Sequence, residues 1–202
     1  MNGKFISLEG VDGAGKSTHL EYLAQYLRDK GRTVVLTREP GGTELGERLR
    51  ELLLHRGAMH ADTEALLMFA ARREHVEQVI KPALARGDWV ISDRFTDASY
   101  AYQCGGRGIA EQRLTQLEDW VLQGFKPSLT LVFDVPAEVA AQRRGQAREA
   151  DRFEQEARDF FQRVRDAYLA RARREPQRIK VIDADRPIAV IRQDLAQILE
   201  TL

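Results

Sequence analysis

A glycine-rich segment near the start of the chain has the residue types and spacing needed to bind phosphate groups. Gly10 is separated by four residues from Gly15, Lys16 and Ser17. Glycines let the backbone curl so that N–H groups point at phosphate oxygens, the lysine reaches the β- and γ-phosphates, and the serine hydroxyl ligates Mg²⁺. A helix that begins here also turns its positive end toward the anion. The segment predicts a P-loop for a nucleoside triphosphate, formed by Gly10, Val11, Asp12, Gly13, Ala14, Gly15, Lys16, Ser17 and Thr18.

A second candidate group follows the apolar run Trp89–Ser92, which ends in Asp93 and Arg94. A P-loop enzyme places at such a strand end the carboxylate that holds Mg²⁺, often through water. Asp93 and Ser17 are therefore the predicted metal ligands, and Arg94 is predicted to hold the phosphate of an acceptor. A salt bridge without a functional role is the alternative interpretation of Asp93 and Arg94.

Four arginines, Arg143, Arg144, Arg148 and Arg152, lie within ten residues and are interleaved with acidic residues. Phosphoryl transfer needs cations that stabilise charge on the moving group, and Lys16 is the only basic residue of the P-loop. A segment of about residues 141–156 is therefore predicted to act as a lid that closes over the triphosphate and excludes water. A solvated helix surface is the alternative interpretation.

The elements that must position these residues follow from apolar periodicity. Helical patterns separate five short apolar runs and end near Gly31, near Gly124 and at the C-terminus. Runs that are apolar throughout predict strands of a parallel sheet covered on both faces, which binds ligands at the carboxyl ends of its strands. The sequence therefore predicts an α/β fold and, without repeats or linkers, a single domain over residues 1–202. The predicted strands are Lys4–Glu9, Thr33–Thr37, Asp88–Ser92, Leu129–Asp134 and Arg178–Ile182.

Composition excludes several classes of protein. The 31 basic and 31 acidic residues balance, so no overall positive field favours nucleic acid. No apolar run is long enough to span a bilayer and no signal sequence is recognised, which predicts a cytoplasmic protein. The single cysteine, Cys104, excludes an internal disulfide framework and a cysteine-based metal cluster.

The P-loop alone does not separate a kinase from a nucleotide-dependent switch. A GTP-dependent switch needs an Asn/Thr-Lys-x-Asp element after a late strand, whereas the late strands here end in Phe133–Val135 and Ile182–Ala184. A small-molecule kinase fits better. Kinases for different nucleoside monophosphates or for a small hydroxy acid, and a nucleotide-gated switch, stay open at this point.

Taken together, the motifs resemble the thymidylate kinase family, whose members phosphorylate dTMP to dTDP. Order and spacing agree over essentially the whole chain. The resemblance implies a three-layer P-loop nucleoside monophosphate kinase fold with a five-stranded parallel sheet, an ATP- and Mg²⁺-dependent enzyme of dTTP synthesis, and a homodimer. The stretches that carry it are Gly10–Thr18, Thr37–Thr43, Leu67–Arg72, Asp93–Gln103 and Asp151–Glu154.

The resemblance also implies residues for the acceptor base. Phe69 would stack on the thymine ring. Arg72 would donate to thymine O4, where cytosine presents an amino donor instead. Ser99 and Gln103 would complete the base contacts, and Pro40 would form an apolar wall near the methyl group.

Further implied roles concern the sugar and the phosphates. Tyr102 would crowd the 2′ position, Asp12 would contact the 3′-hydroxyl, and Arg143 would lie against adenine. Arg38 and Arg94 would hold the dTMP phosphate. The implied catalytic residues are Lys16, Arg94, Asp12 and Arg148.

Three positions distinguish this chain within the family. Some members carry an arginine where this chain has Gly13. The absence of that arginine resembles the bacterial type, which supplies the catalytic arginine from the lid. Arg144 and Arg152 are alternatives to Arg148 for this lid arginine. Cys104 stands where a glycine is common. Arg72 and Arg73 both fit the base-reading position, and Arg72 is preferred because His75 follows it at the family's usual spacing.

Overall fold

The computed structural model describes residues 3–55, 57–144, 152–153, 156 and 158–202. Its centre is a five-stranded sheet in the order β2-β3-β1-β4-β5, in which every neighbouring pair is parallel. The predicted strands are confirmed, with each boundary within one residue. The strands are β1 (Phe5–Glu9), β2 (Val34–Arg38), β3 (Trp89–Asp93), β4 (Leu129–Asp134) and β5 (Ile179–Asp183).

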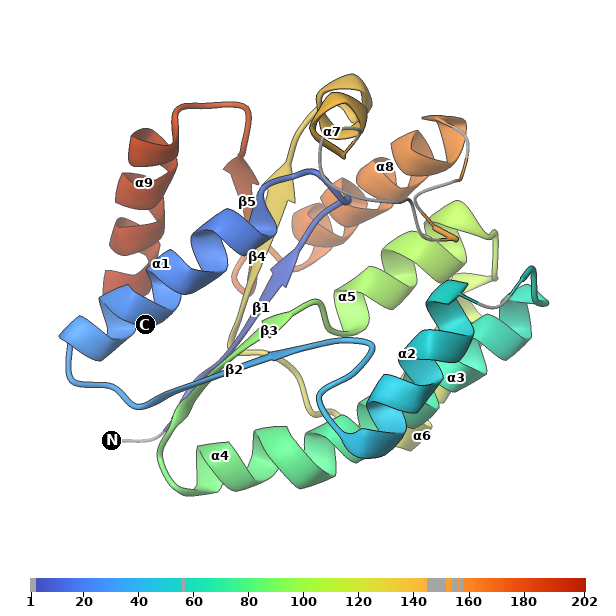
Figure 1. Ribbon diagram of the computed structural model, residues 1–202, viewed down its shortest axis with the longest axis horizontal. Coiled ribbons are helices and arrows are strands. Elements are labelled where there is room, and N and C mark those ends of the chain that lie inside the picture. The colour runs from blue at the N-terminus through green and yellow to red at the C-terminus, as the bar shows by residue number, and fades with distance from the viewer. Residues whose placement is uncertain (1–2, 56, 145–151, 154–155, 157) are drawn as a thin grey trace.

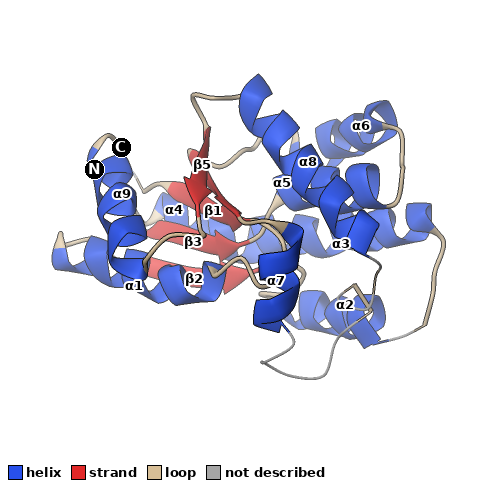
Figure 2. Cartoon of the chain, turned by 90° about the horizontal axis from the view of Figure 1, so that it is seen from above, coloured by secondary structure: helices blue, strands red, loops and turns tan. Residues whose placement is uncertain are grey.

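Helices cover both faces of the sheet. Figure 1 shows α1 (Lys16–Asp29) and α9 (Ile188–Glu200) on one side of the strands, and Figure 2, seen from above, shows α8, α3 and α6 on the other. The remaining elements are α2 (Glu44–His55), α3 (Ala61–His75), the π-helical turn η1 (Val76–Ile80), α4 (Lys81–Ala85), α5 (Thr96–Ser99), the π-helical turn η2 (Tyr100–Gly106), α6 (Glu111–Leu122), α7 (Ala137–Arg144) and α8 (Arg158–Arg174). The α/β fold with helices on both faces is as predicted.

The side chains of β1 point alternately to the two faces of the sheet, and helices cover both faces. Ile6 and Leu8 share an apolar cluster with Leu23 of α1, whereas Phe5 belongs to a second cluster with Ile80 of η1. Successive side chains of a strand point to opposite faces, so a central strand of a covered parallel sheet must be apolar in both directions. The two polar residues Ser7 and Glu9, both buried, are the exception.

Among the described residues, every helix is too short or too polar to cross a bilayer. The carboxyl ends of β1, β2 and β3 meet at one edge of the sheet. There the chain turns into the P-loop, into the Glu39–Thr43 turn and into the Arg94–Phe95 turn. This edge holds the candidate site.

Candidate active site

A cavity of about 810 Å³ opens at the carboxyl ends of the strands. Its size falls within the range of small-molecule sites. The cavity brings together most of the predicted site residues from segments that are distant in sequence. The predicted residues that line it are Asp12, Gly13, Gly15, Lys16, Ser17, Thr18, Arg38, Pro40, Arg72, Asp93, Arg94, Ser99, Tyr102, Gln103 and Arg143.

The P-loop runs from β1 directly into α1. Gly10 has a φ of 133°, and a Cβ there would lie 2.4 Å from the carbonyl oxygen of Phe133, so only glycine fits. The Lys16 ammonium is buried and donates to the carbonyl oxygens of Gly10 at 3.0 Å and Val11 at 3.2 Å. Burial, together with the charge of Arg94, lowers the pKa of Lys16. A bound phosphate would compete with the two carbonyls for this ammonium.

Gly13 lies against helix α7. Its φ is 86°, and a Cβ there would lie 2.3 Å from the carbonyl oxygen of Ala140. A side chain at this position would displace the helix that carries Arg143. The Arg143 guanidinium donates to the Ala184 carbonyl at 3.1 Å and to Asp185 at 3.2 Å, beside the cavity. Its contact with adenine stays a prediction.

Asp93, at the end of β3, presents an oxygen suited to a metal. Its Oδ1 atom is buried and has no hydrogen-bond partner among the described residues. Ser17 lines the same cavity. No group of three or more His, Cys, Asp or Glu side chains forms a metal cluster in the described part of the chain. A single carboxylate plus a hydroxyl fits Mg²⁺, which takes few protein ligands and completes its shell with water and phosphate oxygens.

Arg94 links the P-loop to the acceptor side. Its φ of 71° is unusual for a residue with a side chain, and its N–H donates to the Leu8 carbonyl at 2.9 Å. Its guanidinium donates to Asp12 at 2.7 Å and to the Tyr102 hydroxyl at 3.0 Å. Burial disfavours the charge of Arg94, but Asp12, Tyr102 and Asp93 together outweigh it and the pKa of Arg94 lies above its ordinary value. An arginine in this position is a permanent cation facing the cavity.

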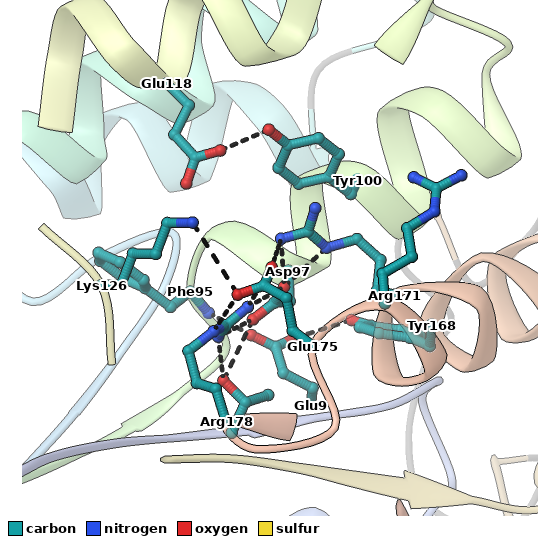
Figure 3. A network of polar contacts seen from close by, with 12 residues as sticks. Glu9, Phe95, Asp97, Tyr100, Glu118, Lys126, Tyr168, Arg171, Glu175 and Arg178 are labelled. Carbon is teal, nitrogen blue, oxygen red and sulfur yellow. Dashed lines mark hydrogen bonds and ion pairs between the residues drawn. The ribbon is translucent and has the colours of Figure 1, made fainter. Parts of the chain in front are cut away.

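A buried polar network holds the Arg94 turn from below (Figure 3). Glu9 accepts from the Phe95 N–H at 2.7 Å and from the Tyr168 hydroxyl at 2.9 Å. Asp97 accepts from Arg171 at 2.9 Å and from Arg178 at 2.7 Å. Burial, followed by repulsion from Asp97, raises the pKa of Glu9 to about 8. Asp97 is equally buried, but its two arginine partners outweigh the burial and lower its pKa.

The base side of the cavity centres on Arg72 of α3. Its guanidinium donates to Glu39 at 2.7 Å, to Ser99 at 3.0 Å and to the Phe95 carbonyl at 3.2 Å. The Phe69 ring lies beneath this guanidinium at 4.5 Å and is buried. The stacking of Phe69 on a base therefore stays a prediction, because Arg72 covers the ring.

Arg73, the alternative base reader, points elsewhere. It donates to the Val121 carbonyl at 2.8 Å and pairs with Glu77 at 3.2 Å. Arg72, and not Arg73, lines the cavity.

Cys104 is half-buried, and burial together with Glu111 raises the pKa of its thiol to about 11, so the thiol is protonated at neutral pH.

The turn after β2 carries Arg38 and Pro40. Arg38 is half-exposed and pairs with Glu47 at 2.9 Å. Pro40 lines the cavity, and the peptide bond that precedes it is cis. Arg50 donates to the Pro40 carbonyl at 2.9 Å and also lines the cavity, although the sequence motifs did not single it out.

Gln103 is connected through Glu64 to Arg152, near the end of the predicted lid. Its amide donates to Glu64 at 2.8 Å, and the other oxygen of this buried carboxylate accepts from Arg152 at 2.6 Å. Phe153 lines the cavity beside Tyr102, with ring centroids 5.7 Å apart. Arg148 and the side chain of Arg144 lie outside the described residues, as does most of the predicted lid.

The buried carboxylates Glu9, Glu39, Glu64 and Asp97 support the site but did not emerge from the sequence as candidate residues. Glu39 and Asp97 each had one signal, their places inside the Thr37–Thr43 and Asp93–Gln103 stretches that carry the family resemblance. The others are single acidic residues whose partners lie far along the chain.

The comparisons with known proteins agree with this geometry. The family model described as "Thymidylate kinase" matches residues 8–195. The chain is 66% identical over 202 residues to a curated thymidylate kinase of Thiobacillus denitrificans, covering 100% of this chain and 98% of the relative. It is 63% identical to that of Cupriavidus necator, with full coverage of both chains. A crystal structure of thymidylate kinase from Ehrlichia chaffeensis superposes with a TM-score of 0.81 at 36% identity and 99% coverage of both chains.

Proposed function

The chain belongs to the thymidylate kinase family, and on this premise we propose that it transfers the γ-phosphoryl group of ATP to the 5′-phosphate of dTMP. The products are dTDP and ADP. The reaction is thus one step in the synthesis of dTTP. One observation carries the proposal beyond the family match: a single cavity holds the P-loop and the acceptor residues Arg72, Arg94 and Pro40. Donor and acceptor would thus meet in one enclosed space.

The reaction forms a bond between an oxygen of the dTMP phosphate and the γ-phosphorus and breaks the bond between that phosphorus and the β,γ-bridging oxygen. The attacking phosphate is already anionic, so the transfer needs no strong general base. Catalysis rests on alignment and on charge stabilisation. Lys16, freed from the Gly10 and Val11 carbonyls, would follow the transferred group. Residues 10–18 would cradle the ATP phosphates, with Arg143 beside adenine.

Mg²⁺ fits Ser17 and the unpartnered Oδ1 of Asp93, and it would neutralise charge on the ATP phosphates. This role also explains why a buried carboxylate oxygen at the end of β3 has no hydrogen-bond donor among the described residues. Lid arginines, with Arg148 foremost, would supply the remaining positive charge.

On the acceptor side, Arg94 would bind the dTMP phosphate, assisted by Arg38. Asp12 holds Arg94 at 2.7 Å, so it would orient that cation as well as contact the 3′-hydroxyl. Tyr102 donates to Asp12 at 3.4 Å and would close the 2′ side of the sugar. Ser99 and Gln103 would complete the base pocket opposite Pro40.

We also propose that the protein is a cytoplasmic homodimer and that residues 1–202 form one kinase domain. Two large apolar side chains on neighbouring helices support the dimer. Leu66 of α3 is 56% exposed and Trp120 of α6 is 75% exposed. Pairing of the α3 and α6 faces of two copies would cover both side chains and would place the interface beside the acceptor pocket.

The experiment that tests the function is a kinetic panel with Mg·ATP and dTMP, dUMP, dCMP, dGMP or shikimate as acceptor. We expect dTMP to give the highest kcat/KM and ATP hydrolysis without acceptor to be negligible beside it. A different preferred acceptor would replace dTMP in the proposal. Slow hydrolysis with no acceptor phosphorylation would instead identify a nucleotide-gated switch.

A further inference from the structure

A chain of polar side chains, formed by buried Glu39 and His75 and part-buried Thr37, lies behind Arg72 and fixes its orientation. Glu39 is 4% exposed and Arg72 is 2% exposed, so the ion pair between them is shielded from water. One oxygen of Glu39 accepts from Arg72 Nε at 2.7 Å, and the other contacts His75 Nδ1 at 2.9 Å. The second ring nitrogen of His75 contacts the Thr37 hydroxyl at 2.6 Å.

The direction of these hydrogen bonds follows from their chemistry. An ionised carboxylate only accepts, so His75 Nδ1 donates to Glu39. In the neutral ring, Nε2 then accepts from Thr37. Gly42 packs against this chain, because a Cβ there would lie 2.6 Å from the His75 ring and 2.7 Å from the Thr37 hydroxyl. The turn after β2 is thus built around the contact between His75 and Thr37.

Arg72 has two N–H groups left for the cavity. A guanidinium carries five N–H groups, and three of them have acceptors among the described residues: Glu39, Ser99 and the Phe95 carbonyl. The two N–H groups that remain lie one on each terminal nitrogen of the guanidinium. The Phe69 ring below and the Phe95 ring at 5.4 Å restrict the plane of the group. Among these three acceptors, Glu39 alone carries a full charge. It accepts from Nε and so restricts the rotation of the guanidinium at the end of the side chain.

We propose that Glu39, held by His75, is a positioning residue that sets the choice of base by aiming the two remaining Arg72 N–H groups into the cavity. This inference rests on the proposed function, in which the acceptor is a pyrimidine nucleoside monophosphate. Donors held in place favour a base with a carbonyl at C4 and oppose one with an amino group there. The selection between thymine and cytosine is therefore made by a residue that touches neither base.

The test compares kcat and KM for dTMP, dUMP and dCMP in four variants. Glu39→Gln keeps the size of the side chain but removes the charge that holds Arg72. Charged hydrogen bonds contribute about 1.5–3 kcal/mol, so we expect the dTMP to dCMP preference to fall by about 10-fold or more. We expect Glu39→Gln to raise the KM for dTMP and to leave kcat nearly unchanged. The dTMP to dUMP preference should stay unchanged, because both bases carry the C4 carbonyl.

His75 provides a matched pair of variants. His75→Asn places an amide donor near the former Nδ1 and should keep most of the base preference. His75→Ala removes the donor and should lower the preference, though less than Glu39→Gln does. Asp88→Asn is the control, because it also neutralises a carboxylate that pairs with an arginine, Arg86 at 3.0 Å, but at the exposed opposite end of β3. Its base preference should equal that of the wild type.

The outcomes separate the inference from the proposed function. A wild-type enzyme that does not phosphorylate dTMP overturns both. Activity on dTMP with an equal loss of kcat/KM for all three acceptors in Glu39→Gln overturns the inference alone, because that result describes a merely structural residue. If Glu39→Gln does not fold, the His75 pair decides: equal base preferences in His75→Ala and His75→Asn refute the positioning role.

Discussion

Replacing Glu9 with glutamine should change how the stability of the protein depends on pH. Glu9 lies at the end of β1, where its carboxyl group accepts from the Phe95 N–H and the Tyr168 hydroxyl. Glutamine has the same shape and can still accept from Phe95, but it does not titrate. The substitution therefore removes one protonation equilibrium while leaving the packing nearly as it was.

The sign and size follow from the pKa of Glu9, which burial and Asp97 raise from 4.5 to about 8. Between these two values the native state holds a proton that the unfolded chain releases. The stabilisation is complete below about pH 4.5 and is lost as the pH rises through about 8. Each pKa unit corresponds to about 1.4 kcal/mol. From about pH 5 to about pH 8 the wild type should therefore lose roughly 3 kcal/mol relative to Glu9→Gln.

Urea unfolding of both proteins at several pH values from about 5 to about 9 measures this difference directly. Glu47→Gln is the control, because the Gly42 N–H and Arg38 lower the pKa of Glu47 despite some burial. A lowered carboxyl pKa affects stability only in acid, so the control difference should be flat over this range. A flat difference for Glu9→Gln, or one that grows in the opposite direction, would refute the account of Glu9 as a protonated buried acid.

Three further substitutions probe the site and its support. Lys16→Ala should reduce turnover by about 100-fold or more while the circular dichroism spectrum stays native, because the ammonium would stabilise negative charge on the transferring phosphoryl group. Near-normal turnover would contradict the assignment. Asp97→Asn removes the buried carboxylate that two part-buried arginines share and should cost about 3–5 kcal/mol in urea unfolding, whereas a loss below about 1 kcal/mol would show that the network is solvated. Gly13→Ala should weaken ATP binding in calorimetry, because the new Cβ would meet the Ala140 carbonyl; unchanged affinity would mean that α7 moves freely.

The strands and the P-loop could be predicted because their causes are local. A strand buried on both faces, such as β1, has to be mostly apolar in both directions and leaves a short, mainly apolar run in the sequence. The P-loop requires glycine where φ is positive, as at Gly10 and Gly15. Asp93 was found for a similar reason, because an acid at a strand end is conspicuous after an apolar run.

The buried acids could not be predicted because their environment is made by distant segments. Glu9 meets Tyr168, which lies 159 residues away. Asp97 meets Arg178, 81 residues away. An isolated acidic residue in a sequence is usually solvated, and only the folded chain shows which ones are enclosed. The contact between the Phe69 ring and the Arg72 guanidinium also depends on the fold, and the stacking of Phe69 on a base stays a prediction.

Arg152 shows how the structure separates arginines that lie close together in the sequence. The sequence offers Arg148 as the first candidate for the catalytic cation of the lid, with Arg144 and Arg152 as alternatives. Arg152 donates to Glu64 at 2.6 Å and to the Leu53 carbonyl at 2.9 Å, and its guanidinium lies 4.6 Å from the Phe153 ring. Glu64 also pairs with Arg107 at 3.3 Å, so release of Arg152 toward the phosphates would remove one of the two cations that face this fully buried carboxylate. Glu64 also holds Gln103, so we expect Arg152 to support the acceptor pocket through this carboxylate and Arg148 or Arg144 to supply the catalytic cation.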